Sequence, residues 1–161
     1  MKSKFNILFI SFLLFPVILV AQDNNVFGKY IPEIDEWDQT EPIESIINIG
    51  DSKLITVIKT YSKGSSNIAF TLSCGKKDLV TTASGIDLSD FTKLTLDGFE
   101  TYKVHSREIG IGSVYLKILE KDDLKGEILI NYIEVDDSEM DDILNEFDFK
   151  GIYFELIKLL K

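Results

Sequence analysis

The chain has 161 residues, of which 45% are hydrophobic and 27% charged, and its formal net charge at pH 7 is −10. This length and composition are typical of one globular domain and leave no room for two cores. The acidic balance excludes a nucleic-acid-binding protein, because phosphate contacts need a basic surface. A single cysteine excludes a disulfide framework within the chain, and a single histidine excludes a histidine-rich metal site.

Residues 1–21 have the layout of a secretory signal peptide. Lys2 and Lys4 give a positive start, residues 5–20 are almost continuously apolar, and Ala21 precedes polar sequence. The alternative, a membrane anchor, is disfavoured because the run is shorter than the ~20 residues that a spanning helix needs. The Ala21-Gln22 boundary resembles signal peptides of the Bacteroidetes. We therefore expect an exported protein, periplasmic or secreted, with no transmembrane span after cleavage.

Residues 22–50 combine two prolines, Trp37 and a cluster of acidic side chains, which favours an irregular N-terminal segment with Trp37 anchored on the core. One helical turn or a short edge strand is compatible with this composition. From residue 51 onward the pattern predicts a single α+β domain. Residues 54–61 are rich in β-branched and aromatic types, and apolar and polar residues alternate over 67–74. The glycine-containing turn between the two runs predicts a β-hairpin.

Further strands are expected at 79–83, around Tyr102 and Val104 (both facing inward), at 114–118 and at 126–135, with a loop over 119–126. Residues 85–98 form a looser stretch. Ser138 is expected to cap a helix with an apolar stripe through residue 147, and Asp148 a second helix over 149–160. The order predicts an antiparallel sheet of about five to six strands with C-terminal helices packed on one face.

The order of short motifs also carries a resemblance. A segment with proline and tryptophan leads to Tyr61-Ser62, a Gly64-Ser65-Ser66 turn and a strand opened by Gly98-Phe99-Glu100-Thr101-Tyr102, and the closing helices contain Phe147-Asp148-Phe149. Over about residues 30–160 this resembles small secreted bacterial proteins with a Mog1/PsbP-like sheet. The resemblance implies a functionally diverse, mostly non-enzymatic group and assigns no active-site residue.

His105 and Cys74 are the only members of their residue types. If Tyr102 and Val104 face inward, His105 lies on the polar face of its strand, as a general base or as a half-exposed strand residue. Cys74 falls on the apolar face of its own strand, where a buried hydrophobe is favoured over a reactive thiol. On opposite faces of one sheet, the two side chains cannot form a nucleophile–base pair.

The strongest charge signal is the acidic run at residues 134–142. Its weak candidates for Ca²⁺ ligands are Asp136, Asp137, Glu139, Asp141 and Asp142. The run lacks the spacing of an EF-hand loop. The alternative interpretation is stabilisation by the helix macrodipole, because acidic side chains are favoured at a helix N-terminus.

Motifs for phosphate binding and for a nucleophile elbow are missing, since Gly110-Ile111-Gly112 is only Gly-x-Gly and Gly-x-Ser-x-Gly does not occur. Four aromatic side chains either line a groove or belong to the core: Tyr30, Trp37, Tyr61 and Tyr102.

The leading hypothesis is an exported, non-enzymatic binding or accessory domain without a cofactor. It takes a basic protein partner or a small ligand through the sheet or through residues 75–98, because the strong negative charge favours a basic partner. One alternative is a hydrolase-type enzyme that uses His105 or carboxylates. The other is a Ca²⁺-stabilised domain that uses the run at 134–142. The sequence leaves the oligomeric state open.

Overall fold

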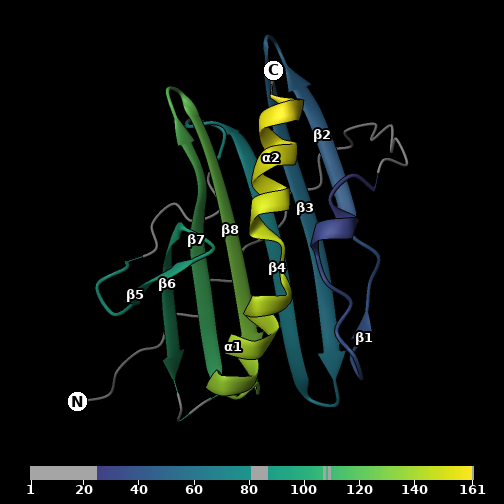
Figure 1. Ribbon diagram of the computed structural model, residues 1–161, viewed down its shortest axis with the longest axis vertical. Helices are drawn as coiled ribbons and strands as arrows, with labels where there is room; N and C mark the ends of the chain where they lie inside the picture. Colours follow the sequence, from purple (N-terminus) through teal and green to yellow (C-terminus); the bar gives the residue numbers. More distant parts are fainter. Residues whose placement is uncertain (1–24, 81–86, 107, 109, 161) are drawn as a thin grey trace, which may run out of the picture.

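The computed structural model describes residues 25–80, 87–106, 108 and 110–160. Its strands form one eight-stranded antiparallel sheet in the order β1-β3-β4-β8-β7-β6-β5, and β2 pairs with the same edge of β3 as β1 does (Figure 1). The strands are β1 (Asp38–Gln39), β2 (Ile43–Ile49), β3 (Ser52–Lys63), β4 (Ser66–Lys76), β5 (Thr92–Leu96), β6 (Phe99–Ser106), β7 (Ile111–Lys121) and β8 (Leu124–Ile133). A 3-10 turn, η1 (Gly28–Tyr30), precedes them, and the helices α1 (Asp137–Glu146) and α2 (Phe149–Leu159) follow.

The predicted α+β class is confirmed, but the expected count of five to six strands is wrong. The extra strands β1 and β2 lie in the segment expected to be irregular, and β5 lies in the stretch expected to be loose. β2 was hard to recognise because its isoleucines at 43, 46 and 47 also fit helical spacing. It joins β3 through a tight turn at Gly50, which has a φ of 58°. The expected domain boundary at residue 51 therefore falls inside a β-hairpin.

The hairpin of β7 and β8 is longer than the sequence indicated. A loop was expected over 119–126, but both strands continue to a turn at Asp122 and Asp123, where Asp122 has a φ of 53°. The end of β7 is charged and exposed at Glu120 and Lys121, whereas β8 begins with the half-buried Leu124 and Lys125, so these strand ends show no clear hydrophobic alternation. A strand was expected at 79–83, but residue 79 lies in a turn. Residues 81–83 lie outside the described part of the chain.

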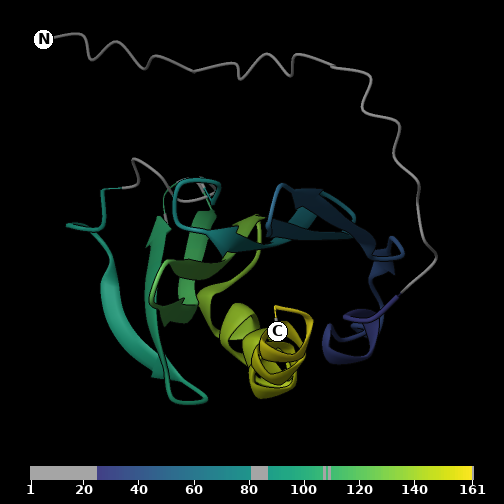
Figure 2. The same ribbon diagram turned by 90° about the horizontal axis from the view of Figure 1, so that it is seen from above.

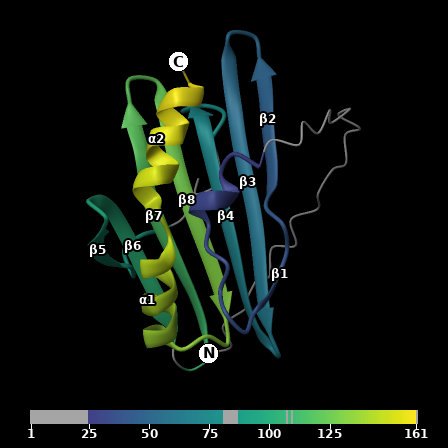
Figure 3. The same ribbon diagram turned by 45° about the vertical axis from the view of Figure 1, so that its right-hand side comes forward.

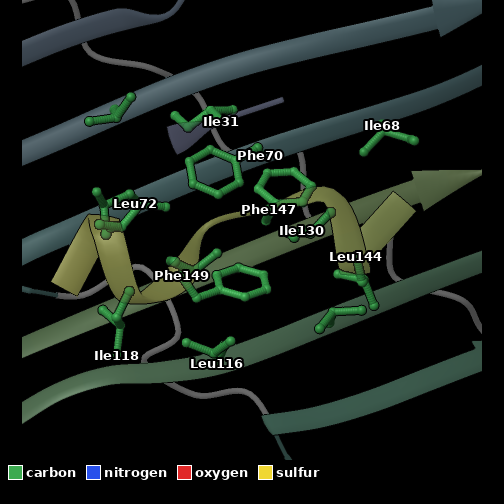
Figure 4. Close-up of a cluster of buried hydrophobic side chains, with 14 of the residues drawn as sticks. Ile31, Ile68, Phe70, Leu72, Leu116, Ile118, Ile130, Leu144, Phe147 and Phe149 are labelled. Atoms are coloured by element: carbon green, nitrogen blue, oxygen red, sulfur yellow. The ribbon is translucent and has the colours of Figure 1, made fainter. Parts of the chain in front are cut away.

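One face of the sheet, here called the inner face, is covered by α1 and α2. Alternate apolar residues of β3, β4, β7 and β8 pack against the helices, and the phenylalanine rings lie in contact (Figure 4). The ring of Phe147 stacks on Phe70 at 5.4 Å and on Phe149 at 5.5 Å between centroids. The expected second helix is confirmed, and the carboxylate of Asp148 accepts a hydrogen bond from the Gly151 amide at 2.7 Å. The N-cap position of the first helix is Asp136 and not the expected Ser138, and the Asp136 side chain makes no capping hydrogen bond.

The N-terminal segment covers the inner face over β3, beside the helices (Figures 2 and 3). Four apolar side chains bury it in the same core: Phe27, Ile31, Ile34 and Trp37. The expected anchoring of Trp37 is thus confirmed. The Pro32 carbonyl accepts hydrogen bonds from Lys59 Nζ at 2.8 Å and from the Tyr61 hydroxyl at 2.9 Å. A polar clamp from β3 therefore holds the segment on the sheet.

The helices are too short and too polar to cross a bilayer: across residues 25–80, 87–106, 108 and 110–160, none meets the length and hydropathy of a membrane span.

The clamp gives a first prediction. Tyr61→Phe removes the hydroxyl that binds the Pro32 carbonyl, and the free energy of unfolding should fall by about 1 kcal/mol in urea denaturation. The matched control is Tyr153→Phe, because the Tyr153 hydroxyl makes no hydrogen bond within the described residues, where its ring contacts Phe99 and Phe154. Equal losses of stability in the two variants would contradict the clamp.

Candidate functional site

Strand β6 faces the opposite way from the prediction. Thr101, Lys103 and His105 lie on the inner face, because they are in register with Leu116, Val114 and Gly112 of β7. Tyr102 and Val104 point to the other face, here called the outer face. The prediction failed because this strand places its polar residues inward, and the acidic start of α1 supplies the partner that such burial requires.

A cavity of about 630 Å³ opens where β6 meets the start of α1. Its walls are His105, Gly110, Glu134, Val135, Asp136, Asp137, Ser138 and Asp141. A second cavity of about 460 Å³ adjoins it and is lined by Thr92, Leu94, Lys103, His105, Asp137 and Asp141. The two share His105, Asp137 and Asp141, so we treat them as one site, named the β6–α1 site.

Lys103 is the cation of the β6–α1 site. Its Nζ lies 2.8 Å from Asp137 Oδ1 and 2.5 Å from Asp141 Oδ1, and it donates to the Asp137 carbonyl at 3.2 Å. The lysine side chain is 10% exposed, so its charge needs these partners. Part of the acidic run thus neutralises a buried lysine, which the sequence analysis did not single out.

His105 is held by stacking. Its ring lies 5.7 Å from the ring of Tyr132, with 13° between the planes. Its Nδ1 is buried and has no hydrogen-bond partner within the described residues. Burial raises the pKa of the Tyr132 hydroxyl, and the carboxylates of Asp137 and Asp141 raise it further, so the phenol stays protonated at neutral pH.

The stack exists because Gly112 has no side chain. The ring of Tyr132 lies across this glycine, and a Cβ placed there would be 2.0 Å from the Tyr132 Cζ atom. An aromatic ring packed over a strand glycine is a recognised way to fill that space. The Gly110-Ile111-Gly112 motif therefore has a structural role: Gly110 turns the chain with a φ of 60°, and Gly112 receives the tyrosine.

The predicted metal candidates do not gather around one point. In the part of the chain that the structure describes, no group of three or more His, Cys, Asp or Glu side chains is placed to hold a metal ion. Asp137 and Asp141 bind Lys103, and Asp136 lines the cavity. Glu139 and Asp142 are not among the residues that line it.

Cys74 and His105 lie on the same face of the sheet, so the expected opposite placement is wrong. They are nevertheless far apart along the strands. Cys74 pairs with Gly126 of β8, whereas His105 pairs with Gly112 of β7, which in turn pairs with Tyr132 of β8. Positions 126 and 132 are six residues apart on β8, which corresponds to about 20 Å. The two side chains do not form a catalytic pair.

The thiol of Cys74 is part of the core, as expected. It is fully buried, and this burial raises its pKa to about 12. At neutral pH the sulfur is protonated and inaccessible, so it has no nucleophilic role.

The aromatic candidates do not line one groove. Trp37 and Tyr61 belong to the core, and Tyr30 packs against α2 with its hydroxyl 3.3 Å from Glu155. Tyr102 lies on the outer face, stacked on Tyr115 at 6.1 Å.

The Tyr102 hydroxyl joins a charged cluster on the outer face. It donates to Glu100, which also binds Lys117 and Lys93. Hydrogen bonds from Lys117, Lys93 and Tyr102, in this order, lower the pKa of the Glu100 carboxyl to about 2. This carboxylate is therefore saturated with donors and is no candidate for acid–base chemistry.

Comparison of the chain with protein-family models, with curated proteins and with solved structures finds no match. The Mog1/PsbP-like resemblance stays a prediction, and the β6–α1 site rests on its own geometry.

The glycine under Tyr132 gives a second prediction. Gly112→Ala forces the tyrosine ring away from β7, and overpacking of this kind costs about 1–3 kcal/mol of folding free energy. The matched control is Gly64→Ala, a turn glycine with nothing within 4 Å of an added Cβ but a strained φ of 63°. Crystal structures of both variants should show a displaced Tyr132 and His105 in Gly112→Ala alone. An unmoved stack would contradict this account.

The buried thiol gives a third prediction. In the folded protein, Cys74 should react with Ellman's reagent only as fast as the protein unfolds, because the thiol is buried and protonated. In denaturant, one thiol per chain should react at once. Rapid labelling of the native protein would show that Cys74 is accessible.

Proposed function

We propose that this chain is an exported, non-enzymatic binding domain whose β6–α1 site takes a cationic group. The ligand is a lysine or arginine side chain of a basic protein partner, or a small amine with the same charge. The observation that carries the proposal is the composition of the cavity wall, in which the described residues include four carboxylates and the ring of His105.

The charge of the cavity favours a cation. Among the described residues, its carboxylates belong to Glu134, Asp136, Asp137 and Asp141, and Lys103 supplies one positive charge against them. The whole chain carries a formal charge of −10, so the same sign extends beyond the cavity. Concave acidic surfaces of this kind attract basic partners and accelerate their association.

The donors and acceptors of the wall fit the same ligand. Ammonium and guanidinium groups have only donors, and the carboxylates beside the His105 ring supply acceptors. The cavity volume of about 630 Å³ falls in the usual range of ligand sites. A basic side chain can thus meet carboxylates and the imidazole in one place.

The hydrolase alternative has less support. Ser138 lines the same cavity as His105, but no hydrogen bond joins its hydroxyl to the imidazole within the described residues. Activation of a serine needs such a contact. The Cys74 thiol lies at the other end of the sheet. We therefore favour binding over catalysis.

The export part of the proposal depends on the sequence of residues 1–21, which lie outside the described residues. Their charge and hydropathy pattern is that of a cleaved signal. The proposed location is the periplasm or the extracellular space.

The binding proposal gives a fourth prediction. A fluorescein-labelled octalysine peptide should bind to the protein in an anisotropy titration, and added salt should weaken the binding. The double variant Glu134→Gln/Asp136→Asn should bind roughly two- to five-fold more weakly for each carboxylate lost. Both residues are exposed at the cavity and have no side-chain ion pair among the described residues, so the fold should survive.

The matched control removes two charges from helix α1, which follows Glu134 and Asp136 in the chain. Asp142→Asn/Glu146→Gln neutralises two exposed acids that do not line the cavity. This variant should bind the peptide about as well as the parent protein. Equal weakening in both double variants would mean that the peptide responds to overall charge, and the site would then be wrong. Binding of an octaglutamate peptide would show that the protein does not select for positive charge, and this would also contradict the site.

A further inference from the structure

Strand β2 forms an edge of the sheet. Within the described residues it pairs with β3 alone, and its register is unbroken from Ile43 to Ile49. The backbone groups on its other side are therefore available to a further strand. Such an edge is a template for strand addition unless charges, prolines or bulges block it.

Between Ile43 and Ile49 this protection is limited to one charged residue. The strand has no proline and no bulge, and Glu44 is its one charged residue. The Glu44 carboxylate points to the inner face, where it accepts hydrogen bonds from the amides of Val26 at 2.9 Å and Phe27 at 2.7 Å. The opposite edge strand, β5, carries the exposed Lys93. The two edges thus differ in how they are protected.

Apolar side chains accompany the open edge of β2. Ile43, Ile46 and Ile49 are 66%, 39% and 44% exposed, and Ile58 of β3, which pairs with Ile43, is 40% exposed. The outer-face positions of β2 and β3 carry no charge: they are Ile43, Ser45, Ile47, Ile49, Ser52, Leu54, Thr56, Ile58, Thr60 and Ser62. On a chain with a formal charge of −10, this uncharged surface is a preferred place for association.

We propose that β2 pairs with β2 of a second copy of this chain and joins the two sheets into one. The sequence of the strand is self-complementary for antiparallel pairing about Ile46. In that register Ile46 lies opposite its own counterpart, and Ile43 lies opposite Ile49 of the second copy. Outer-face residues then meet outer-face residues, because 43 and 49 have the same parity.

The charges of the strand fit this register. Glu44 lies opposite Asn48 of the second copy, so the two carboxylates do not face each other. Two copies of an acidic chain repel one another, and contact through a strand with only one carboxylate keeps most of their acidic side chains apart. The twofold arrangement also closes on itself, so both β2 edges are used and no open filament results.

Sedimentation equilibrium tests the proposal with the mature protein, purified from an export-competent host that expresses the full sequence. The parent protein should form a dimer that dissociates on dilution. Ile46→Lys places two like charges directly opposite each other and should raise the dissociation constant roughly ten-fold or more. The control Phe154→Lys makes the same change at a 67% exposed position on α2 and should leave the dimer unchanged.

A parent protein that stays monomeric up to its solubility limit would overturn the proposal. So would a folded Ile46→Lys variant that dimerises like the parent. If circular dichroism shows that Ile46→Lys does not fold, oxidation of Ile46→Cys decides the question. It should give a disulfide between two copies at position 46, whereas Phe154→Cys should not. An Ile46→Cys protein that forms no disulfide between two copies on oxidation would refute the pairing.

Discussion

The inner face of the sheet must be covered, and the rest of the structure depends on how this is done. Alternate residues of β3, β4, β7 and β8 are apolar, and an antiparallel sheet gains its stability by burying one such face. The two C-terminal helices cover the middle strands, and the N-terminal segment covers β3. Sequence-distant parts of the chain are therefore joined at one core. Where the N-terminal segment packs on the sheet, Lys59 and Tyr61 donate hydrogen bonds to the Pro32 carbonyl, so this backbone group keeps hydrogen-bond partners.

The β6–α1 site lies where this cover ends. At the start of α1 the inner face is polar, with Lys103 and His105 in place of aliphatic side chains. A buried lysine needs negative partners, and Asp137 and Asp141 of α1 supply them. The same acids leave a surplus of negative charge around the cavity. One local constraint, the burial of a cation, thus explains both the orientation of β6 and part of the acidic run. The cation preference in the proposed function follows from the carboxylates that remain.

The outer face has a charged part and an uncharged part. At β6 and β7, Glu100 binds two lysines and Tyr102, so that part of the surface is saturated with ion pairs. At β2 and β3 the outer face is uncharged and rich in isoleucine, threonine and serine. Charged sheet surface favours contact with water, whereas uncharged surface beside an open strand edge favours contact with another strand. The proposed binding of a cation and the proposed pairing of β2 use different parts of the molecule, so each can be tested without the other.

The sequence by itself determined the α+β class, the hairpin of β3 and β4, the second helix and the burial of Cys74, because these features follow from local periodicity, turn residues and capping. It did not determine β2, whose isoleucines fit two periodicities, or the orientation of β6, whose inward residues are polar. The sequence did not indicate the roles of Lys103, Tyr132 and Gly112. A lysine in a strand is normally exposed, and a glycine can serve several structural purposes. Their roles arise from contacts between residues far apart in the chain, such as Lys103 with Asp141 and Gly112 with Tyr132. Such contacts are decided by the tertiary structure, because a local sequence pattern does not show which distant residues a side chain will pack against.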